Sequence, residues 1–141
     1  MPVANKTRTF RWAIESHLAS GRRPGIEGKR GSQVPTPIVN AWIKEAKQTY
    51  GIRSIICLLD EHQLKFYEKL PVDLVSYYRA EGFDVAHIPA PNMRQPPLSD
   101  QHLKRVWSAY KRLEKPVLLH CSAGIGRSGA AVRYIKQHSQ D

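Results

Sequence analysis

Apolar residues along the chain follow two patterns in turn, helical spacing and short continuous runs. Residues 36–50 begin with Thr36 and Pro37, which suit an N-cap and a first helical position, and apolar side chains then recur every three or four residues. These apolar positions are Ile38, Trp42, Ile43, Ala46 and Tyr50. Residues 54–59 form an apolar run that is too short for a helix and does not alternate, as is typical of a strand covered on both faces.

The rest of the chain continues this alternation of strand and helix. Further strands are expected at 10–14, 18–20, 83–89 and 117–120. Further helices are expected at 64–80 with a break near Pro71, at 99–113, and from Ser128 onward. The alternation predicts an α/β fold, in which a largely parallel central sheet is flanked by helices on both faces.

The composition fits a single domain, residues 1–141, with a strongly basic charge. The hydrophobic share is 41%, and the net charge is +10 at pH 7. About half of the positive excess lies in residues 1–34, which contain Lys6, Arg8, Arg11, Arg22, Arg23, Lys29 and Arg30. Residues 21–35 form a basic loop rich in Gly and Pro. The charge favours a phosphorylated protein, another anionic phosphoester, nucleic acid or acidic lipid as partner, without choosing among them.

Several functional classes are disfavoured by what the sequence lacks. No stretch approaches the ~18 apolar residues of a membrane span, and the first ten residues have no apolar leader segment. Two cysteines, Cys57 and Cys121, are too few for a disulfide framework, and the histidines show no zinc-site spacing. We therefore expect a cytoplasmic monomer with no membrane span, no metal and no cofactor.

The candidate chemistry lies in residues 117–129, which read VLLHCSAGIGRSG. An apolar strand leads into small residues and then into a helix start, so loop N–H groups and the helix dipole can converge on a phosphate. The same positive field favours the thiolate form of Cys121, a nucleophile suited to attack phosphorus. Phosphate contacts are expected from Ser122, Ala123, Gly124, Ile125, Gly126 and the planar guanidinium of Arg127.

Residues 120–129 resemble, at all ten positions, the signature loop of cysteine-dependent protein tyrosine phosphatases. The segment FRWAIESHLASGRRPG and the order of elements are similar, more weakly, to the small dual-specificity subgroup. The resemblance implies the phosphatase fold and hydrolysis of phosphotyrosine, extended to phosphoserine and phosphothreonine. By the same resemblance, Cys121 forms a phosphocysteine while Arg127 holds the phosphoryl oxygens. Ser128 would hydrogen-bond the sulfur and His120 would orient the loop, and no metal is required.

The proton donor to the leaving oxygen departs from the family pattern. The family takes this proton from an Asp in the loop that here is residues 90–95, and that loop reads APNMRQ, without an acid. Asp60, with Glu61 beside it, follows a strand expected to end at the site, whereas Asp100 also suits the first turn of a helix. Both stay candidate acids. Three functions therefore stay open: a protein phosphatase, a phosphatase of RNA 5′ ends or phosphoinositides, and a phosphate-binding module with little turnover.

Two further expectations concern the second cysteine and the end of the chain. Some relatives protect the nucleophile with a second cysteine, and Cys57 lies in the strand expected beside the one that ends at Cys121. The two Cα atoms are expected within disulfide reach, with an inert core Cys57 as the alternative. The sequence ends a few residues beyond the helix after Arg127, where relatives usually continue, so we expect a minimal version of the fold or a shortened chain.

Overall fold

The central sheet has five strands, and its middle strand leads into residues 121–127, which we call the candidate loop. The computed structural model describes residues 9–29 and 31–140, in which the strand order is β1-β2-β5-β3-β4. The strands are β1 (Phe10–Ile14), β2 (Leu18–Gly21), β3 (Ser54–Cys57), β4 (Asp84–His87) and β5 (Val117–His120). β1 and β2 are antiparallel, whereas β2, β5, β3 and β4 run parallel to one another. The predicted, largely parallel sheet is confirmed.

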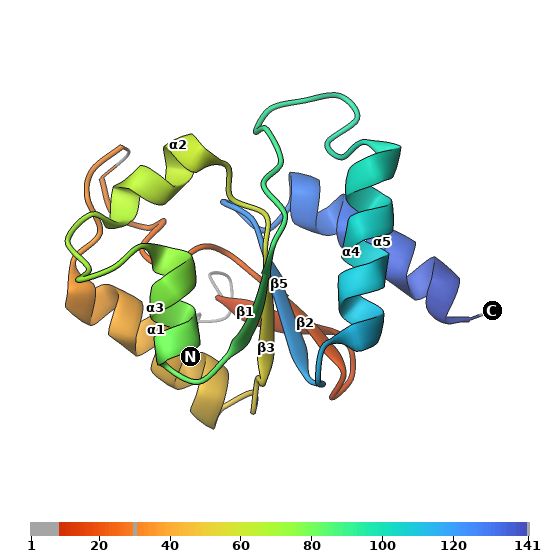
Figure 1. Ribbon diagram of the computed structural model, residues 1–141, viewed down its shortest axis with the longest axis horizontal. Helices are drawn as coiled ribbons and strands as arrows, with labels where there is room; N and C mark the ends of the chain where they lie inside the picture. The colour runs from red at the N-terminus through yellow and green to blue at the C-terminus, as the bar shows by residue number, and fades with distance from the viewer. Residues whose placement is uncertain (1–8, 30, 141) are drawn as a thin grey trace, which may run out of the picture.

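Helices cover both faces of the sheet, as predicted (Figure 1). On one side lie α1 (Thr36–Gln48), α2 (Glu61–Leu64), the 3₁₀ helix η2 (Lys65–Tyr67) and α3 (Leu74–Ala80); on the other lie α4 (Asp100–Arg112) and α5 (Gly126–Ser139). The core is divided in the same way. Ile55 of β3 packs with the group of buried side chains that contains Trp42 and Tyr78, and Ile56 packs with the group that contains Ile135. Successive side chains of a strand point to opposite faces, so each strand contributes to both groups.

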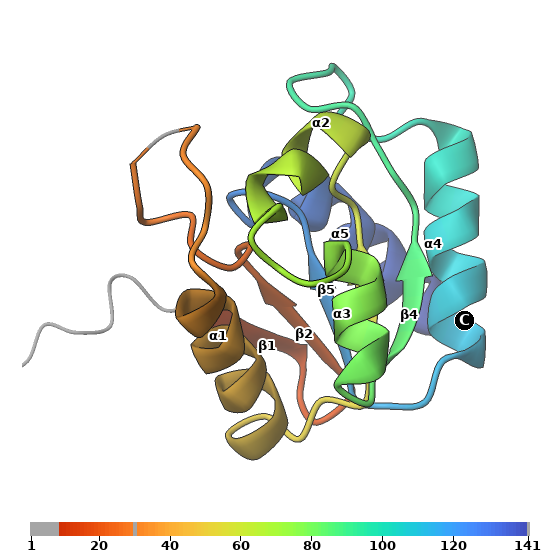
Figure 2. The same ribbon diagram turned by 60° about the vertical axis from the view of Figure 1, so that its left-hand side comes forward.

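The carboxyl ends of the parallel strands meet at one edge of the sheet. Figure 2 shows α2 and the segment 91–98 at this edge, beyond the arrowhead of β4. The pairing of β3 with β5 continues past the regular strands, because the Leu58 N–H donates to the His120 carbonyl oxygen at 2.9 Å. Open parallel sheets bind their ligands at this edge, where the loops converge.

Two helical regions differ from the sequence prediction. The N-cap of α1 is Pro35, and Thr36 is already its first helical residue. Val39 is buried where Ile38 was expected, because residue 39 keeps the i, i+3, i+4, i+7 spacing with the buried residues 42, 43 and 46. The helix expected over 64–80 is divided into α2, η2 and α3, since Asp60 and Asp73 each cap a separate helix start.

Part of the basic N-terminal segment falls outside the described residues, namely Lys6, Arg8 and Arg30. Within the described part of that segment, Arg22 forms an ion pair with Glu27 at 3.5 Å. In residues 9–29 and 31–140, no helix combines the length and the hydrophobicity that crossing a bilayer requires.

Candidate active site

The candidate loop joins β5 to α5 through a tight turn against the end of β2. Gly124 has a φ of +78°, a left-handed conformation that favours glycine, and a Cβ there would lie 2.9 Å from the Gly21 carbonyl oxygen. A Cβ at Gly126 would meet nothing within 4 Å. Gly124 is therefore required by packing and backbone conformation, whereas Gly126 leaves the backbone open at the start of α5.

Cys121 lines a cavity of ≈ 430 Å³ at the carboxyl edge of the sheet. The cavity is lined by the candidate loop and by residues of the segment 92–97. Only 2% of Cys121 is exposed, and the Ser128 hydroxyl donates to its Sγ at 3.0 Å. A hydroxyl donated to sulfur stabilises the thiolate more than the thiol.

His120 is a neutral residue behind the loop. Its Nδ1 lies 3.0 Å from the Cys121 carbonyl oxygen, and its Nε2 lies 3.0 Å from the Tyr78 hydroxyl. Because the carbonyl can only accept, we assign the proton to Nδ1, and Nε2 then accepts from Tyr78. Burial lowers the pKa of His120 to about 4 and raises the pKa of Tyr78 well above its ordinary value. At pH 7 His120 is therefore neutral, orients the Cys121 carbonyl and adds no positive charge beside the sulfur.

Arg127 is anchored on one side of its guanidinium and open on the other. It is 3% exposed, and its Nη1 donates to the Leu58 carbonyl at 3.2 Å, the Ala90 carbonyl at 2.7 Å and Gln63 Oε1 at 3.0 Å. Its Nε and Nη2 make no hydrogen bond to any described residue, and Arg127 lines the cavity of Cys121. Two parallel N–H donors are therefore available for the two oxygens of a phosphoryl group.

Gln63 is a site residue that the sequence analysis missed. Its backbone N–H donates to Asp60 Oδ1 at 2.8 Å, and its side-chain Oε1 accepts from the Asp60 N–H at 3.3 Å as well as from Arg127. The Asp-x-x-Gln spacing is a signal for a helix start. Nothing in that spacing indicates the contact with Arg127, 64 residues away in the sequence.

Arg23 is a second missed residue, and it holds the loop from the side opposite α5. It is 8% exposed; its backbone N–H donates to the Ser122 carbonyl at 2.9 Å, and its Nε donates to the Ser122 hydroxyl at 3.2 Å. Its Nη1 donates to the Tyr67 hydroxyl at 3.1 Å. The sequence marks Arg22 and Arg23 alike as basic, so only the packed structure distinguishes the buried arginine from the one at the surface.

The structure separates the candidate acids by position. Asp60 is the N-cap of α2 and lines a second cavity of ≈ 480 Å³, which shares Ser122 and Asn92 with the cavity of Cys121. Asp100 is exposed in the first turn of α4. Glu61 lines a third cavity, which contains neither Cys121 nor Asp60. Neither Asp100 nor Glu61 is among the described residues that line the cavity of Cys121 or the cavity of Asp60. Among the described residues, no three His, Cys, Asp or Glu side chains are grouped to hold a metal ion.

Cys57 and Cys121 lie on opposite faces of the sheet, which corrects the expected pairing. Their strands are neighbours as predicted, with Cys57 in register with His120. Cys57 packs with the group of Trp42, whereas Cys121 packs with the group of Ile135. Both thiols are free, and burial raises the pKa of Cys57 to about 12. Adjacency of strands is not sufficient for a disulfide, because alternate side chains point to opposite faces.

Comparison with known proteins agrees with this geometry. Residues 18–141 match the family described as "DSP-PTPase phosphatase fused to NAD+ Kinase". The chain belongs to this phosphatase family. The matched range includes the whole candidate loop and every strand except β1. No curated protein matches the sequence of this phosphatase.

Solved structures show that the phosphatase has the protein tyrosine phosphatase fold. Tk-PTP in its active form has a TM-score of 0.61 and 19% identity, covering 94% of this chain and 74% of its own. The core catalytic domain of the PP-IP phosphatase SIW14 from S. cerevisiae, in complex with citrate, has a TM-score of 0.58 and 13% identity, with 95% and 68% covered. PTPMT1 in complex with PI(5)P has a TM-score of 0.58 and 10% identity, with 92% and 83% covered. At these identities the likeness establishes the fold alone.

Proposed function

We propose that this phosphatase hydrolyses phosphotyrosine in proteins through a phosphocysteine, and phosphoserine and phosphothreonine in the same way. The observation that carries the proposal is that Cys121 Sγ, with its hydroxyl donor, and the open edge of Arg127 belong to one cavity. Sγ attacks phosphorus, and the electron pair of the broken P–O bond goes to the leaving oxygen, which takes up a proton. Water then attacks phosphorus and gives up a proton, the S–P bond breaks, and the thiolate is restored as phosphate leaves.

The surrounding residues have separate roles in these two steps. Nε and Nη2 of Arg127, with the N–H groups of residues 122–127, hold the phosphoryl oxygens while their negative charge redistributes. The Ser128 hydroxyl stabilises the sulfur when it leaves as a thiolate in the second step. His120 is a positioning residue, since it contacts the Cys121 carbonyl and not the reacting atoms.

We assign the proton for the leaving oxygen to Asp60, with Asp100 as the second candidate. Asp60 supports this role by position, because its cavity adjoins that of Cys121 at Ser122. One of its oxygens, Oδ1, is held by the Gln63 N–H, which fixes the orientation of the carboxyl group. A proton donor must come within hydrogen-bond reach of the leaving oxygen, directly or through one water.

A small phosphorylated molecule is the second candidate substrate. Arg94 lies at the catalytic cavity, and the segment 90–95 contains no acid, so a leaving group that needs no proton would suit this site. A triphosphorylated RNA 5′ end is such a substrate, because its leaving group is already a phosphate. A phosphoinositide still needs a proton on its leaving oxygen and is favoured by the basic charge, and two neighbours of the same fold carry PP-IP and PI(5)P in their descriptions. The family description also names a fusion with NAD+ kinase, which favours a metabolite over a protein. A phosphate-binding module with little turnover is the third candidate, and we expect a cytoplasmic monomer in each case.

One panel of substrates tests these candidates. A phosphotyrosine peptide, a phosphoserine peptide, PI(5)P vesicles and 5′-triphosphate RNA are incubated with the wild-type protein, and phosphate release is measured. The proposal expects turnover of the phosphotyrosine peptide, its loss in Cys121→Ser with retained vanadate binding, and a loss of about 10²-fold or more in Arg127→Lys. Hydrolysis of the peptide by Cys121→Ser would exclude the covalent mechanism. Turnover of only the lipid or the RNA selects the second candidate, and binding without turnover selects the third.

A further inference from the structure

The cavity beside the catalytic one is connected to it through two residues of the site. Ser122 and Asn92 line both the ≈ 430 Å³ catalytic cavity and the ≈ 480 Å³ neighbouring cavity. The neighbouring cavity is lined further by Arg23, Asp60, His62 and Phe66. A substrate whose phosphate is held by the candidate loop can therefore extend a second group into this neighbouring cavity.

Arg23, which lines the neighbouring cavity, is a buried cation that has no carboxylate partner among the described residues. All its hydrogen-bond acceptors are neutral: the Ser122 and Tyr67 hydroxyls and the Pro24 carbonyl. The ion pairs of the described residues are Arg22–Glu27 and Arg53–Glu114, and neither includes Arg23. Burial of a charge is costly unless an opposite charge compensates for it. The position of Arg23 is therefore one that an anion would stabilise.

One nitrogen of Arg23 is available to such an anion. Nε donates to Ser122, Nη1 donates to Tyr67, and the guanidinium lies 4.7 Å from the centroid of the Phe66 ring. Nη2 makes no hydrogen bond to a described residue, and no fully buried side-chain nitrogen or oxygen among those residues lacks a partner. Nη2 is therefore accessible from the cavity. Arg127 is likewise held by neutral acceptors, but through Nη1 alone, so it keeps two open nitrogens where Arg23 keeps one.

We propose that Arg23 forms a second anion subsite and that the substrate is a phosphomonoester carrying a second phosphate group. The candidate loop and Arg127 hold the phosphate that is cleaved, while Arg23 Nη2 binds the phosphate that is kept. The inference rests on the second candidate of the proposed function, in which the same site hydrolyses a small phosphorylated molecule. An inositol ring and a nucleoside are two scaffolds that carry two phosphates, and both present the same chemistry to Arg23.

Asp60 limits which anions the subsite accepts. Its carboxylate lines the same cavity but forms no ion pair with Arg23, and its Oδ1 accepts from the Gln63 N–H. A second phosphate close to Asp60 is repelled, so the retained phosphate must lie on the Arg23 side of the cavity. Replacing this carboxylate by an amide should strengthen the binding of the second phosphate.

The test is calorimetric binding to the Cys121→Ser protein, with ligands in pairs that differ by one phosphate. The pairs are inositol 1-phosphate with inositol 1,4-bisphosphate, and adenosine 2′-monophosphate with adenosine 2′,5′-bisphosphate. We expect the second phosphate to tighten binding about tenfold or more in at least one pair, and the pair that responds identifies the scaffold. Adding Arg23→Gln should remove this gain, and adding Asp60→Asn should increase it.

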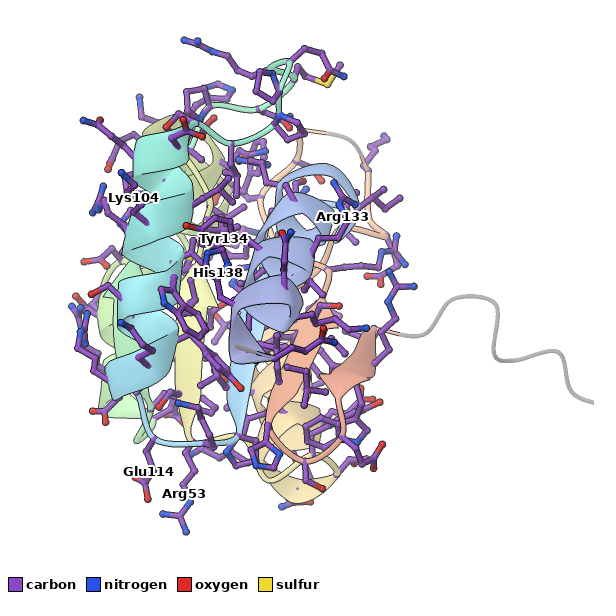
Figure 3. The ribbon with its side chains drawn as sticks, turned by 90° about the vertical axis from the view of Figure 1, so that its right-hand side faces the viewer. Arg53, Lys104, Glu114, Arg133, Tyr134 and His138 are labelled. Carbon is purple, nitrogen blue, oxygen red and sulfur yellow. The ribbon has the colours of Figure 1, made fainter. Side chains whose placement is uncertain are left out.

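Two controls separate the subsite from other effects of Arg23. Arg53→Gln removes the same charge at the opposite end of the molecule, where Arg53 lies beside Glu114 (Figure 3), and should keep the ratio of the two affinities unchanged. Ser122→Ala removes only the acceptor of Arg23 Nε and keeps both the charge of Arg23 and its backbone hydrogen bond to residue 122, so the second phosphate should still tighten binding.

The outcomes distinguish the subsite from the proposed function. Equal affinities within both pairs, or a ratio that survives Arg23→Gln, would overturn the subsite. A ratio that falls equally in Arg53→Gln would also overturn it, since the effect would then come from net charge. If the ratio behaves as expected but the wild-type protein releases no phosphate from any ligand, the small-molecule candidate of the proposed function fails while the subsite stands.

Discussion

The residue that best shows how this site depends on burial is His120. It stands next to Cys121, the proposed nucleophile, in the sequence, which suggests an electrostatic role for its imidazole. In the structure it is fully buried between Tyr78 and the Cys121 carbonyl, and its edge faces the ring of Trp42. Burial disfavours the charged form, so the imidazole acts as a neutral hydrogen-bonding unit.

The burial of His120 predicts a pH dependence of stability. Its pKa is lowered from 6.5 to about 4 in the folded chain, so between those values the unfolded chain binds a proton that the folded chain does not. Above pH 6.5 the residue contributes no pH dependence. As the pH falls towards 4, the free energy of unfolding should decrease by about 3 kcal/mol from this residue alone.

Urea unfolding of the wild-type protein and of His120→Asn between pH 7.5 and 4.5 checks this expectation. The variant should be less stable at pH 7, and the difference between the two proteins should shrink as the pH falls. Parallel curves over the whole range would show that the proton-binding difference lies elsewhere.

At the scale of elements, the short helix α2 connects Asp60, the candidate acid, to Arg127, the proposed phosphate-binding residue. Asp60 caps the helix, Gln63 completes the capping box, and the side chain of Gln63 also accepts from Arg127. One turn of helix therefore fixes the orientation of groups from two different cavities. The position of α2 follows from the end of β3, because Leu58 and Leu59 lead directly from the strand into the cap.

The cap allows a clean substitution for the acid. Asn is as good an N-cap as Asp, so Asp60→Asn should retain α2 while losing the proton. Hydrolysis of a phosphotyrosine peptide should fall by about 10²–10⁴-fold, whereas hydrolysis of p-nitrophenyl phosphate, whose leaving group needs no proton, should change little.

Asp100→Asn is the matched control for this experiment. Asp100 is exposed at the start of α4 and is not among the described residues that line the cavity of Cys121, so its amide should leave both rates unchanged. A fall in phosphotyrosine hydrolysis in Asp100→Asn, with none in Asp60→Asn, would assign the acid to Asp100.

At the scale of the whole molecule, the sheet separates the two cysteines. Cys57 is buried on the face covered by α1 and α3, and Cys121 belongs to the face covered by α4 and α5. The pKa of Cys57 is about 12, so its thiol stays protonated and unreactive at neutral pH. Among the described residues, Cys57 is not one of those that line the cavity of Cys121.

Mild peroxide treatment tests this separation. We expect oxidation of Cys121, a corresponding loss of phosphatase activity, and an intact Cys57 thiol in the mass spectrum of the digested protein. Cys57→Ser should lose activity at the same rate as the wild-type protein, since Cys57 does not trap the oxidised sulfur. A peptide in which Cys57 is linked to Cys121 would contradict this prediction.

Much of the fold could be predicted because its signals are local. The strand at 10–14 was predicted to the residue. The helix predicted at 99–113 is shorter in the structure by one residue at each end, since α4 is Asp100–Arg112. Both elements follow from hydrophobic spacing, and the helix follows also from its Ser99 cap. These signals act within one strand or one helical turn. The break near Pro71 was predicted as well, because a proline is also a local signal. The division of the part before Pro71 into α2 and η2 was not predicted.

The sequence by itself determined the order of elements, the parallel sheet and the loop that holds Cys121 and Arg127. These features depend on residues that are close together in the sequence. The spacing of such residues determines the backbone conformation, and it also determines which side of an element is buried. The tertiary structure alone decided that Arg23 and not Arg22 turns inward, that Gln63 binds Arg127, and that the two cysteines face apart. The contacts of Arg23 and Gln63 join residues 99 and 64 positions apart in the sequence. Such contacts form only when packed elements bring particular faces together. The spacing of residues within one element does not contain that information.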